Sequence, residues 1–250
     1  MACPIPSVLY QTKGLPAAQA INIYVGAGQS NFQGNALISG FSGQYQSNIL
    51  NTNIWTGSRA DGLIAGVNNQ GVDSLRAGPE LSFGVAKATA IGKTIGLVKW
   101  AVGGTTLAVD WVAGTGPQYV TLKARVQAAL NYWNSNNYIP TIKGFLWMQG
   151  ESDAQTLAYA NAYNANLQAF IAQFKTDFAS SLSGSFVFAI GGLGAISYTY
   201  TSTVQAAQAA VGALGGNATF TNTDLTLQGD GLHFDSPAQT TLGTRFSGVV

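Results

Sequence analysis

Residues 21–31 of the chain read Ile-Asn-Ile-Tyr-Val-Gly-Ala-Gly-Gln-Ser-Asn. This apolar run of strand-forming residues stops in a turn flanked by glycines, which predicts a buried strand with a tight turn at its carboxyl end. Ser30 lies in that turn. Because ligands of open α/β sheets bind outside the carboxyl ends of the strands, a serine presented there by small neighbours is a candidate nucleophile. Taken alone, the same pattern is more often a plain turn with a capping serine.

The rest of the chain alternates between strand-like and helix-like patterns. Further strands are expected at residues 94–102, 142–148, 185–190 and 218–221, and helices from Gly-Pro-Glu at 78–80, around 122–133, along 163–178, around 204–214 and from Ser236 onward. Strands that alternate with helices form a parallel sheet covered on both faces, with right-handed crossovers. We therefore expect an α/β protein with a five-stranded parallel sheet in a three-layer, flavodoxin-like α/β/α sandwich.

The chain shows no linker, internal repeat or low-complexity tract. A single domain is therefore expected over residues 21–250, preceded by an N-terminal arm at residues 1–20. Residues 32–78 are rich in Asn, Gly, Ser and Gln and give few signals of regular structure. Long loops in compact domains are usually functional, so this stretch is expected to wall the site.

Charged residues are scarce: they make up 8% of the chain and leave a formal net charge of +1, whereas 46% of the residues are hydrophobic. The 11 Lys and Arg residues are scattered and form no basic stripe, so nucleic acid is not an expected partner. The polar residues are mainly amides and hydroxyls. Such a surface suits neutral ligands such as sugars, and it is equally typical of extracellular or virion proteins.

Cysteine usage and hydropathy give few further constraints. Cys3 is the only cysteine, so no disulfide within the chain is possible. Cysteine usage therefore indicates neither an oxidising nor a reducing compartment. No run approaches the roughly eighteen apolar residues of a membrane span, and residues 1–4 lack the features of a signal peptide. No membrane association is expected. The oligomeric state and the compartment are unassigned, although the low charge favours an extracellular or virion-associated protein.

Glycine-bearing turns are predicted at the carboxyl ends of strands: Gly-Gln-Ser-Asn at 28–31, Gly-Gly-Thr at 103–105, Gln-Gly-Glu-Ser-Asp at 149–153 and Asp-Gly-Leu-His at 230–233. The parallel topology predicts that these turns share one edge of the sheet. A serine hydroxyl needs a base to act as a nucleophile, and the only histidine is His233. Asp230 can reach the Nδ1 proton of His233 and leave Nε2 for Ser30.

Each of these residues also has a more ordinary role. A lone histidine is more often a surface residue or a satisfied core residue, and Asp230 can simply cap its own turn. Asp110, Asp224 and Asp235 compete for the role of carboxylate partner.

Five motifs occur in a familiar order: Gly-Gln-Ser-Asn at 28–31, Gly-Pro-Glu at 78–80, Gly-Gly-Thr at 103–105, Trp-Met-Gln-Gly-Glu-Ser-Asp at 147–153 and Asp-Gly-Leu-His at 230–233. Together they resemble the SGNH hydrolase superfamily, in the branch that holds sialate O-acetylesterases and acetylxylan esterases. The resemblance spans residues 21–248. It implies a serine esterase that removes O-acetyl groups from carbohydrates, with an acetylated carbohydrate as its partner and no cofactor.

The resemblance also implies roles for single residues. Ser30 is the nucleophile, His233 the general base and then acid, and Asp230 the residue that orients His233. The backbone N–H groups of Ser30 and Gly104 bind the oxyanion, or that of Gly103 if the turn is read one residue earlier.

A third oxyanion donor departs from the wider superfamily. That donor is usually an Asn in a Gly-x-Asn-Asp block, which this chain lacks, so Gln149 is expected in its place. Substrate binding or support of the loops is expected for Gln29, Asn31, Glu80, Gly103, Thr105, Trp111 and Glu151. Trp55 and the segment around Trp111 are candidates for stacking on sugar faces.

Glu151 and Asp153 admit two interpretations. Two carboxylates can act as an acid and base pair, as in glycosidases, but carboxylates beside a helix start commonly interact with the dipole, so Glu151 is expected to support the loop that holds Gln149. One His and one Cys at distant positions do not make a zinc site, whereas calcium in the Asn- and Asp-bearing loops is left open. The alternative function is a non-catalytic carbohydrate-binding or phage-tail-type structural module on the same fold.

Overall fold

The computed structural model describes residues 17–250, so most of the expected N-terminal arm lies outside the described residues. In chain order the elements are β1 (Gln19–Gly28), α1 (Ser30–Gln33), β2 (Ala36–Leu37), η1 (Ile38–Gly40), η2 (Gly43–Tyr45), β3 (Asn48–Trp55), β4 (Ala60–Ile64), β5 (Arg76–Ala77), α2 (Glu80–Ile91), β6 (Ile95–Ala101), α3 (Pro117–Ser135), β7 (Tyr138–Met148), η3 (Asp153–Gln155), α4 (Leu157–Asp177), η4 (Ala179–Ser181), β8 (Leu182–Gly191), α5 (Thr201–Gly212), β9 (Asn217–Phe220) and α6 (Ser236–Val249).

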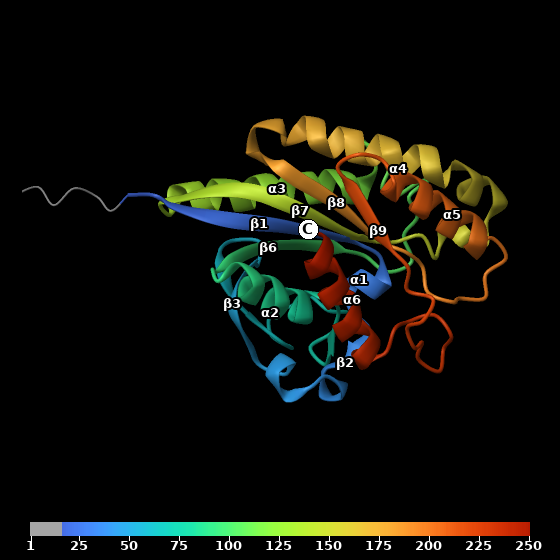
Figure 1. The fold of residues 1–250 in the computed structure, drawn as a ribbon, viewed down its shortest axis with the longest axis horizontal. Coiled ribbons are helices and arrows are strands. Elements are labelled where there is room, and N and C mark those ends of the chain that lie inside the picture. Colours follow the sequence, from blue (N-terminus) through green and yellow to red (C-terminus); the bar gives the residue numbers. More distant parts are fainter. Residues whose placement is uncertain (1–16) are drawn as a thin grey trace, which may run out of the picture.

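Seven of these strands form one sheet in the order β4-β3-β6-β1-β7-β8-β9 (Figure 1). Neighbouring strands are parallel, except that β3 and β4 are antiparallel. The predicted α/β class with a central parallel sheet is therefore confirmed. The predicted number of five strands is wrong, because β3 and β4 extend the sheet by two.

The two additional strands come from residues 32–78, which were expected to be a long loop. Ile49, Thr52 and Ile54 of β3 are buried, but the pattern is irregular because Asn51 adopts a positive φ of 56°. The pairing of β3 with β4 shifts register in the same part of the strand. Such a break removes the strict alternation by which a strand is recognised.

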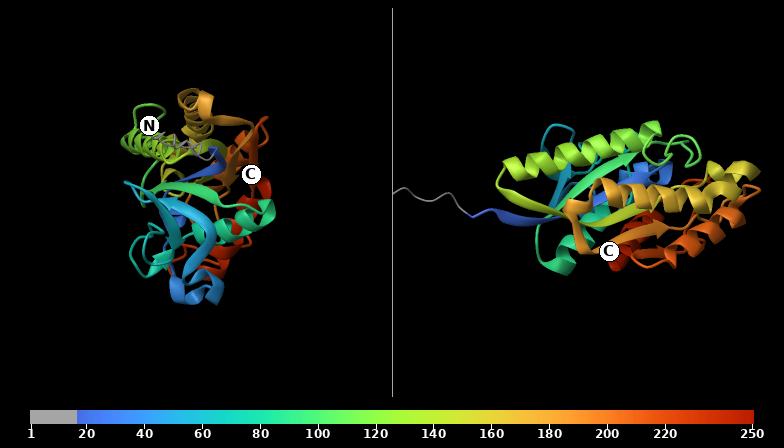
Figure 2. Two further views of the ribbon diagram at one scale, coloured as in Figure 1. Left: turned by 90° about the vertical axis from the view of Figure 1, so that its left-hand side faces the viewer. Right: turned by 90° about the horizontal axis from the view of Figure 1, so that it is seen from above.

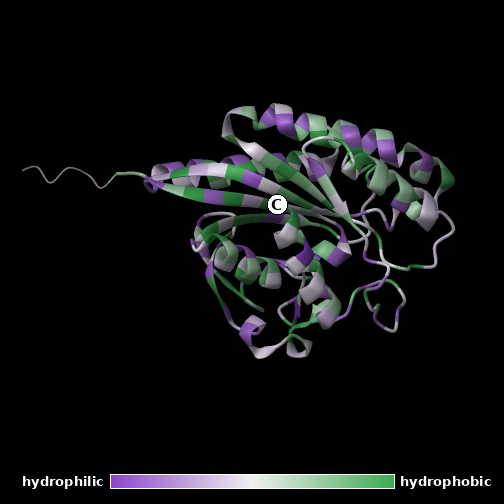
Figure 3. Cartoon of the chain, viewed as in Figure 1, coloured by the Kyte–Doolittle hydropathy of each residue, from purple (hydrophilic) through white to green (hydrophobic). Residues whose placement is uncertain are grey.

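Helices cover both faces of the sheet: Figures 1 and 2 show α3 and α4 over one face, and α2 and α6 over the other. Successive residues of β1 point to opposite faces of the sheet. The side chain of Ile23 lies with Trp133 of α3 beside Gly96, on one face. The ring of Tyr24 contacts Phe83 of α2 on the other face. In Figure 3, hydrophobic and hydrophilic residues alternate along α4, as expected of a helix with one buried face.

The register of the three central strands brings their carboxyl ends together. Gly28, the last residue of β1, is paired with Ala101 of β6 on one side and with Met148 of β7 on the other. The turns that begin at Gln29, Val102 and Gln149 therefore start side by side. Within residues 17–250, no helix combines the length and the apolar character that crossing a membrane requires.

Candidate active site

Ser30 lies at the carboxyl end of β1, as its sequence context predicts, and it is the first residue of the short helix α1. The preceding Gly28 has a φ of 149°, and a Cβ atom there would lie 1.8 Å from the carbonyl oxygen of Met148. Only glycine fits this close approach of the two strand ends. The Ser30 side chain is consequently held at the edge of the sheet with the residue only 8% exposed.

His233 and Asp230 lie in the loop between β9 and α6 and complete a chain of hydrogen bonds with Ser30. The distance from His233 Nε2 to Ser30 Oγ is 2.9 Å, and that from His233 Nδ1 to Asp230 Oδ2 is 2.6 Å. Asp230 Oδ1 also accepts hydrogen bonds from the backbone N–H groups of Leu232 and His233. One carboxylate thus closes the turn and orients the imidazole.

These contacts keep Asp230 ionised. Partial burial acts to raise the pKa of its carboxyl, but hydrogen bonds from the backbone and ring of His233 and from the Leu232 N–H outweigh it and lower the pKa to about 2. A carboxylate beside Nδ1 favours a proton on that nitrogen and leaves Nε2 free to accept one.

The three competing aspartates have other partners. Asp110 accepts hydrogen bonds from the N–H and hydroxyl of Thr106. Asp224 forms an ion pair with Arg245, and Asp235 caps helix α6 through the N–H of Ala238.

Asn31 connects the segments that carry the site. Its Nδ2 donates to Glu151 Oε1 at 2.7 Å and to the Leu232 carbonyl at 3.2 Å, and its Oδ1 accepts from Phe234 N at 2.9 Å. Gln239 of α6 donates to the Asn31 carbonyl. Asn31 therefore supports the loop that carries His233, and its side chain is fully engaged.

The backbone N–H groups in the turns after β1 and β6 differ in whether they have a hydrogen-bond partner. Within the described part of the chain, no hydrogen bond uses the N–H of Ser30 or that of Gly104. The N–H of Gly103, in contrast, donates to Gln33 Oε1 at 2.9 Å. Of the two glycines predicted as alternatives, Gly104 thus has the available donor.

The amide hydrogens of Gln149, expected to provide a third oxyanion donor, already have acceptors within the protein. Its side chain is buried, and its Nε2 donates to Asp153 Oδ2 at 2.6 Å and to the Thr105 carbonyl at 3.1 Å. An amide nitrogen carries two hydrogens, and both are engaged here. The expectation for Gln149 is therefore corrected: its side chain joins the turn after β6 to the turn after β7.

Gln29 belongs to the same buried network. In one orientation of its carboxamide, Gln29 Oε1 accepts from Gln149 Nε2 and from the backbone N–H groups of Gly150 and Ser152. In the orientation with oxygen and nitrogen exchanged, the amide nitrogen donates to the Glu151 carboxylate. Gln29 has an exposed fraction of only 2%, so it supports the loop and does not face solvent.

Glu151 and Asp153 are both buried, with exposed fractions of 1% and 0%. Desolvation raises the pKa of Glu151, although the hydrogen bond from Asn31 opposes the shift. Desolvation also raises the pKa of Asp153, which accepts from Gln149 Nε2 and from the backbone N–H groups of Leu107 and Ala108. This placement suits support of the two turns and not the acid and base pair of a glycosidase.

The two tryptophans expected to stack on sugars are in the core. Trp111 has no exposed surface, packs edge-to-face on Trp147, and donates through Nε1 to Thr105 Oγ1 at 2.8 Å. Trp55 is 3% exposed. The expectation of stacking is corrected for both residues; Trp111 instead holds the Thr105 hydroxyl, which donates to the Val102 carbonyl.

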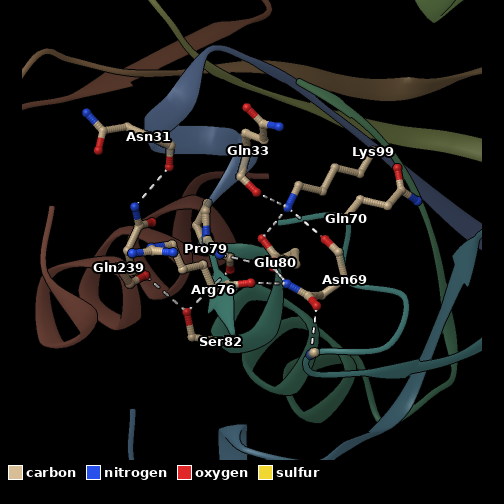
Figure 4. A network of polar contacts seen from close by, with 12 residues as sticks. Asn31, Gln33, Asn69, Gln70, Arg76, Pro79, Glu80, Ser82, Lys99 and Gln239 are labelled. Carbon is tan, nitrogen blue, oxygen red and sulfur yellow. Dashed lines mark hydrogen bonds and ion pairs between the residues drawn. The ribbon is translucent and has the colours of Figure 1, made fainter. Parts of the chain in front are cut away.

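Glu80 forms a buried ion pair with Lys99, a residue that sequence analysis missed (Figure 4). Their charged atoms lie 2.8 Å apart, and Glu80 also accepts from Gly78 N and Asn69 Nδ2. Lys99 Nζ donates further to the carbonyls of Gln33 and Asn69. Glu80 therefore supports a loop and does not line the site. The sequence does contain a signal for Lys99: it is a single lysine within the apolar strand β6, and a buried lysine needs a partner.

Metal-binding groups are not gathered anywhere in residues 17–250: no three His, Cys, Asp or Glu side chains are placed to hold an ion.

Comparisons with known proteins identify the family of the chain. A family model described as carbohydrate esterase, sialic acid-specific acetylesterase, matches residues 20–250. No significant relative was found among curated proteins.

Solved structures resemble the chain in fold. A protein of Arabidopsis thaliana is 22% identical with a TM-score of 0.78, the match covering 92% of this chain and 97% of that one. NanS is 14% identical with a TM-score of 0.68 and coverage of 94% and 97%. A carbohydrate acetylesterase from Xanthomonas citri is 14% identical with a TM-score of 0.61, covering 90% of this chain and 55% of that one. The family match extends over nearly the whole sequence, and the chain therefore belongs to the sialic acid-specific acetylesterase family of carbohydrate esterases and is a carboxylic ester hydrolase.

Proposed function

We propose that this protein removes O-acetyl groups from carbohydrates by a Ser-His-Asp mechanism that passes through an acetyl-enzyme. The observation that carries the proposal is the continuous chain of hydrogen bonds from Ser30 Oγ through His233 to Asp230. The family assignment favours this esterase over the alternative of a non-catalytic module.

In the first half of the reaction, Ser30 Oγ attacks the carbonyl carbon of the acetyl group while His233 Nε2 takes the hydroxyl proton. Asp230 stabilises the imidazolium that forms. The free N–H groups of Ser30 and Gly104 bind the negative oxygen of the tetrahedral intermediate, and each such donor typically contributes about 100- to 1000-fold in turnover. The bond between the acetyl carbon and the sugar oxygen then breaks as the imidazolium gives its proton to that oxygen. The sugar leaves with a free hydroxyl group, and the acetyl group stays on Ser30 Oγ.

In the second half, water replaces the sugar. His233 Nε2 takes a proton from the water molecule as its oxygen attacks the acetyl-enzyme, and the same N–H groups bind the oxyanion again. The proton returns to Ser30 Oγ when the bond between Oγ and the acetyl carbon breaks. Acetate leaves, and the site is restored.

The test is Ser30→Ala with a small acetate ester as substrate. We expect turnover to fall by roughly 10⁴-fold or more, because the nucleophile is lost. A serine-directed phosphonate should label the wild-type protein at Ser30 and should not label the variant. Ser185→Ala, a change at an exposed serine in β8, serves as the matched control and should behave as wild type. Substantial activity in a folded Ser30→Ala protein would remove the mechanism.

A further inference from the structure

A hollow of about 720 Å³ lies at the amino ends of the strands, whereas Ser30 follows the carboxyl end of β1. It is lined by residues 19–21 of β1, residues 48–53 of β3, Gly62, Lys93, Thr94 and Tyr138. Figure 1 shows α1, which contains Ser30, beyond the far end of β1. At about 3.3 Å per residue, the strand from Gln19 to Gly28 is about 30 Å long. A small ester bound at Ser30 therefore does not reach the hollow.

The hollow exists because β6 starts later than its two neighbours. In the sheet β6 lies between β3 and β1, and its first residue, Ile95, pairs with Thr52 of β3 and with Asn22 of β1. Residues 48–51 of β3 and 19–21 of β1 therefore extend past the start of β6. Adjacent strands are about 4.8 Å apart, so two strands on either side of an empty position leave a slot about 10 Å wide between their backbones. The volume of the hollow is within the roughly 300–1,000 Å³ of ligand sites.

The side chains that line the hollow are mainly amides without partners in the protein. Among the residues that the structure describes, no hydrogen bond is formed by the side chains of Gln19, Asn48, Asn51, Asn53 or Tyr138. A carboxamide offers a donor and an acceptor side by side, and a hydroxyl group can serve either of them. The lining is therefore suited to a ligand that carries many hydroxyl groups.

Charge and apolar surface in the hollow point to the same kind of ligand. Lys93 is the only charged residue of the lining and forms no ion pair within residues 17–250. The residue is exposed, so water screens its charge and no anionic ligand is needed to compensate it. Tyr138 is partly buried against the core, and Leu50 is 71% exposed. A sugar ring, with hydroxyl groups at its edge and C–H groups on its faces, can contact both the amides and these apolar surfaces.

We propose that this hollow is a second carbohydrate-binding site, which holds a neutral, unacetylated stretch of a polymeric glycan while an acetylated unit of the same polymer lies at Ser30. The binding itself is independent of the esterase function proposed above, and only its effect on deacetylation rests on that function. Binding at the hollow raises the effective concentration of ester groups near Ser30, because the second contact forms within one complex. A monosaccharide or a small ester is too short to gain from it.

The first experiment measures binding by calorimetry, with unacetylated xylohexaose, mannohexaose and maltohexaose as probes. We expect at least one of them to bind the wild-type protein. Asn51→Gly removes one amide, and glycine adopts the positive φ of 56° at this position without strain. Asn51→Gly and Tyr138→Leu should each weaken binding by about tenfold, the change expected when one hydrogen bond or ring contact is lost. Asn161→Ala, at an exposed amide of α4 outside the hollow, is the matched control and should bind as wild type does.

The second experiment compares hydrolysis of a small acetate ester with that of the acetylated form of the polysaccharide whose hexasaccharide binds most tightly. Asn51→Gly should raise KM for the polymer by about tenfold and leave kcat/KM for the small ester unchanged.

The outcomes separate this inference from the proposed function. If no hexasaccharide binds, or if Asn51→Gly and wild type bind equally, the second site is wrong whether or not the protein is active. Equal losses on the small ester and on the polymer would also overturn it, because the hollow would then act only through the fold. If binding depends on Asn51 but no ester is hydrolysed, the second site stands and the esterase mechanism fails.

Discussion

Asn31 Oδ1 accepts a hydrogen bond from Phe234 N at 2.9 Å and so ties the residue after Ser30 to the residue after His233. The two positions are 203 residues apart in the chain. Because the other end of the same amide contacts the buried Glu151, the spacing of Ser30 and His233 depends on three separate segments at once. Geometry at the site is therefore a property of the whole fold.

The first prediction concerns Asp230. In Asp230→Asn, the amide oxygen can still accept from the backbone N–H groups, but an NH₂ group facing His233 Nδ1 favours the wrong tautomer. We expect kcat for a small acetate ester to fall by roughly 10³- to 10⁴-fold with little change in thermal stability. Asp224→Asn, at an exposed aspartate paired with Arg245, is the matched control. A loss below about tenfold in steady-state kinetics would argue against the role of Asp230.

The second prediction concerns Gln33, a positioning residue. Gln33→Leu removes the acceptor that fixes Gly103, so the neighbouring Gly104 N–H is expected to be less well aligned with the oxyanion. Because complete loss of a donor costs about 100- to 1000-fold, we expect a misaligned one to lower kcat by about tenfold with KM nearly constant and the pH profile unchanged. Gln127→Leu, at an exposed position of α3, should have no effect. An unchanged kcat in Gln33→Leu would show that the contact is dispensable.

The third prediction concerns pH and stability. Burial raises the pKa of Glu151, so the folded state binds this proton more firmly than the unfolded state. The free energy of unfolding therefore falls as pH rises above the ordinary pKa of a glutamate, about 4.3. Glu151→Gln keeps an acceptor for Asn31 without the charge, so it should flatten the dependence of Tm on pH between about 5 and 8 and raise Tm at the upper end.

Calorimetric melting across that pH range checks the result. Asp224→Asn is the control, because a carboxyl whose pKa is lowered is already ionised in this window and its removal should not alter the slope. A Glu151→Gln protein with the slope of wild type would contradict the prediction.

The fourth prediction concerns the buried pair of Lys99 and Glu80. Lys99→Met leaves Glu80 as a buried charge without its partner and removes the donor to Gln33 and Asn69, so we expect it to lower the free energy of unfolding by roughly 3–5 kcal/mol. Combining it with Glu80→Gln should cost much less than the sum of the single changes, because no charge is then left uncompensated. Urea unfolding of the four proteins measures the coupling, and additive losses would count against it.

The contacts of His233 with Ser30 and Asp230 were predictable because the signals are simple: a strand ending in glycines, an Asp three residues before the only histidine, and a parallel topology that brings both turns to one edge of the sheet. The directions of Gln149 and Trp111 are set by tertiary packing, which places the amide of Gln149 against Asp153 and the ring of Trp111 against Trp147. At the end of a strand, no spacing rule distinguishes a side chain that points toward Ser30 from one that points into the core.

Other features were hidden for different reasons. The break at Asn51 obscured β3, and the four-residue helix α1 is too short to give a periodic pattern. The carbonyls of Gln33 and Asn69, which accept from Lys99, lie 66 and 30 residues away in the chain, so only the folded structure brings these groups together.

The dependence of the site on Asn31 and Gln239 has a consequence for biosynthesis. Ser30 leaves the ribosome 203 residues before His233, and Asn31 leaves it 208 residues before Gln239, the α6 residue that donates to the Asn31 carbonyl. Over that interval of synthesis the growing polypeptide carries the proposed nucleophile without the base proposed to activate it. We expect hydrolytic competence to require that α6 and the loop before it dock on the carboxyl end of β1.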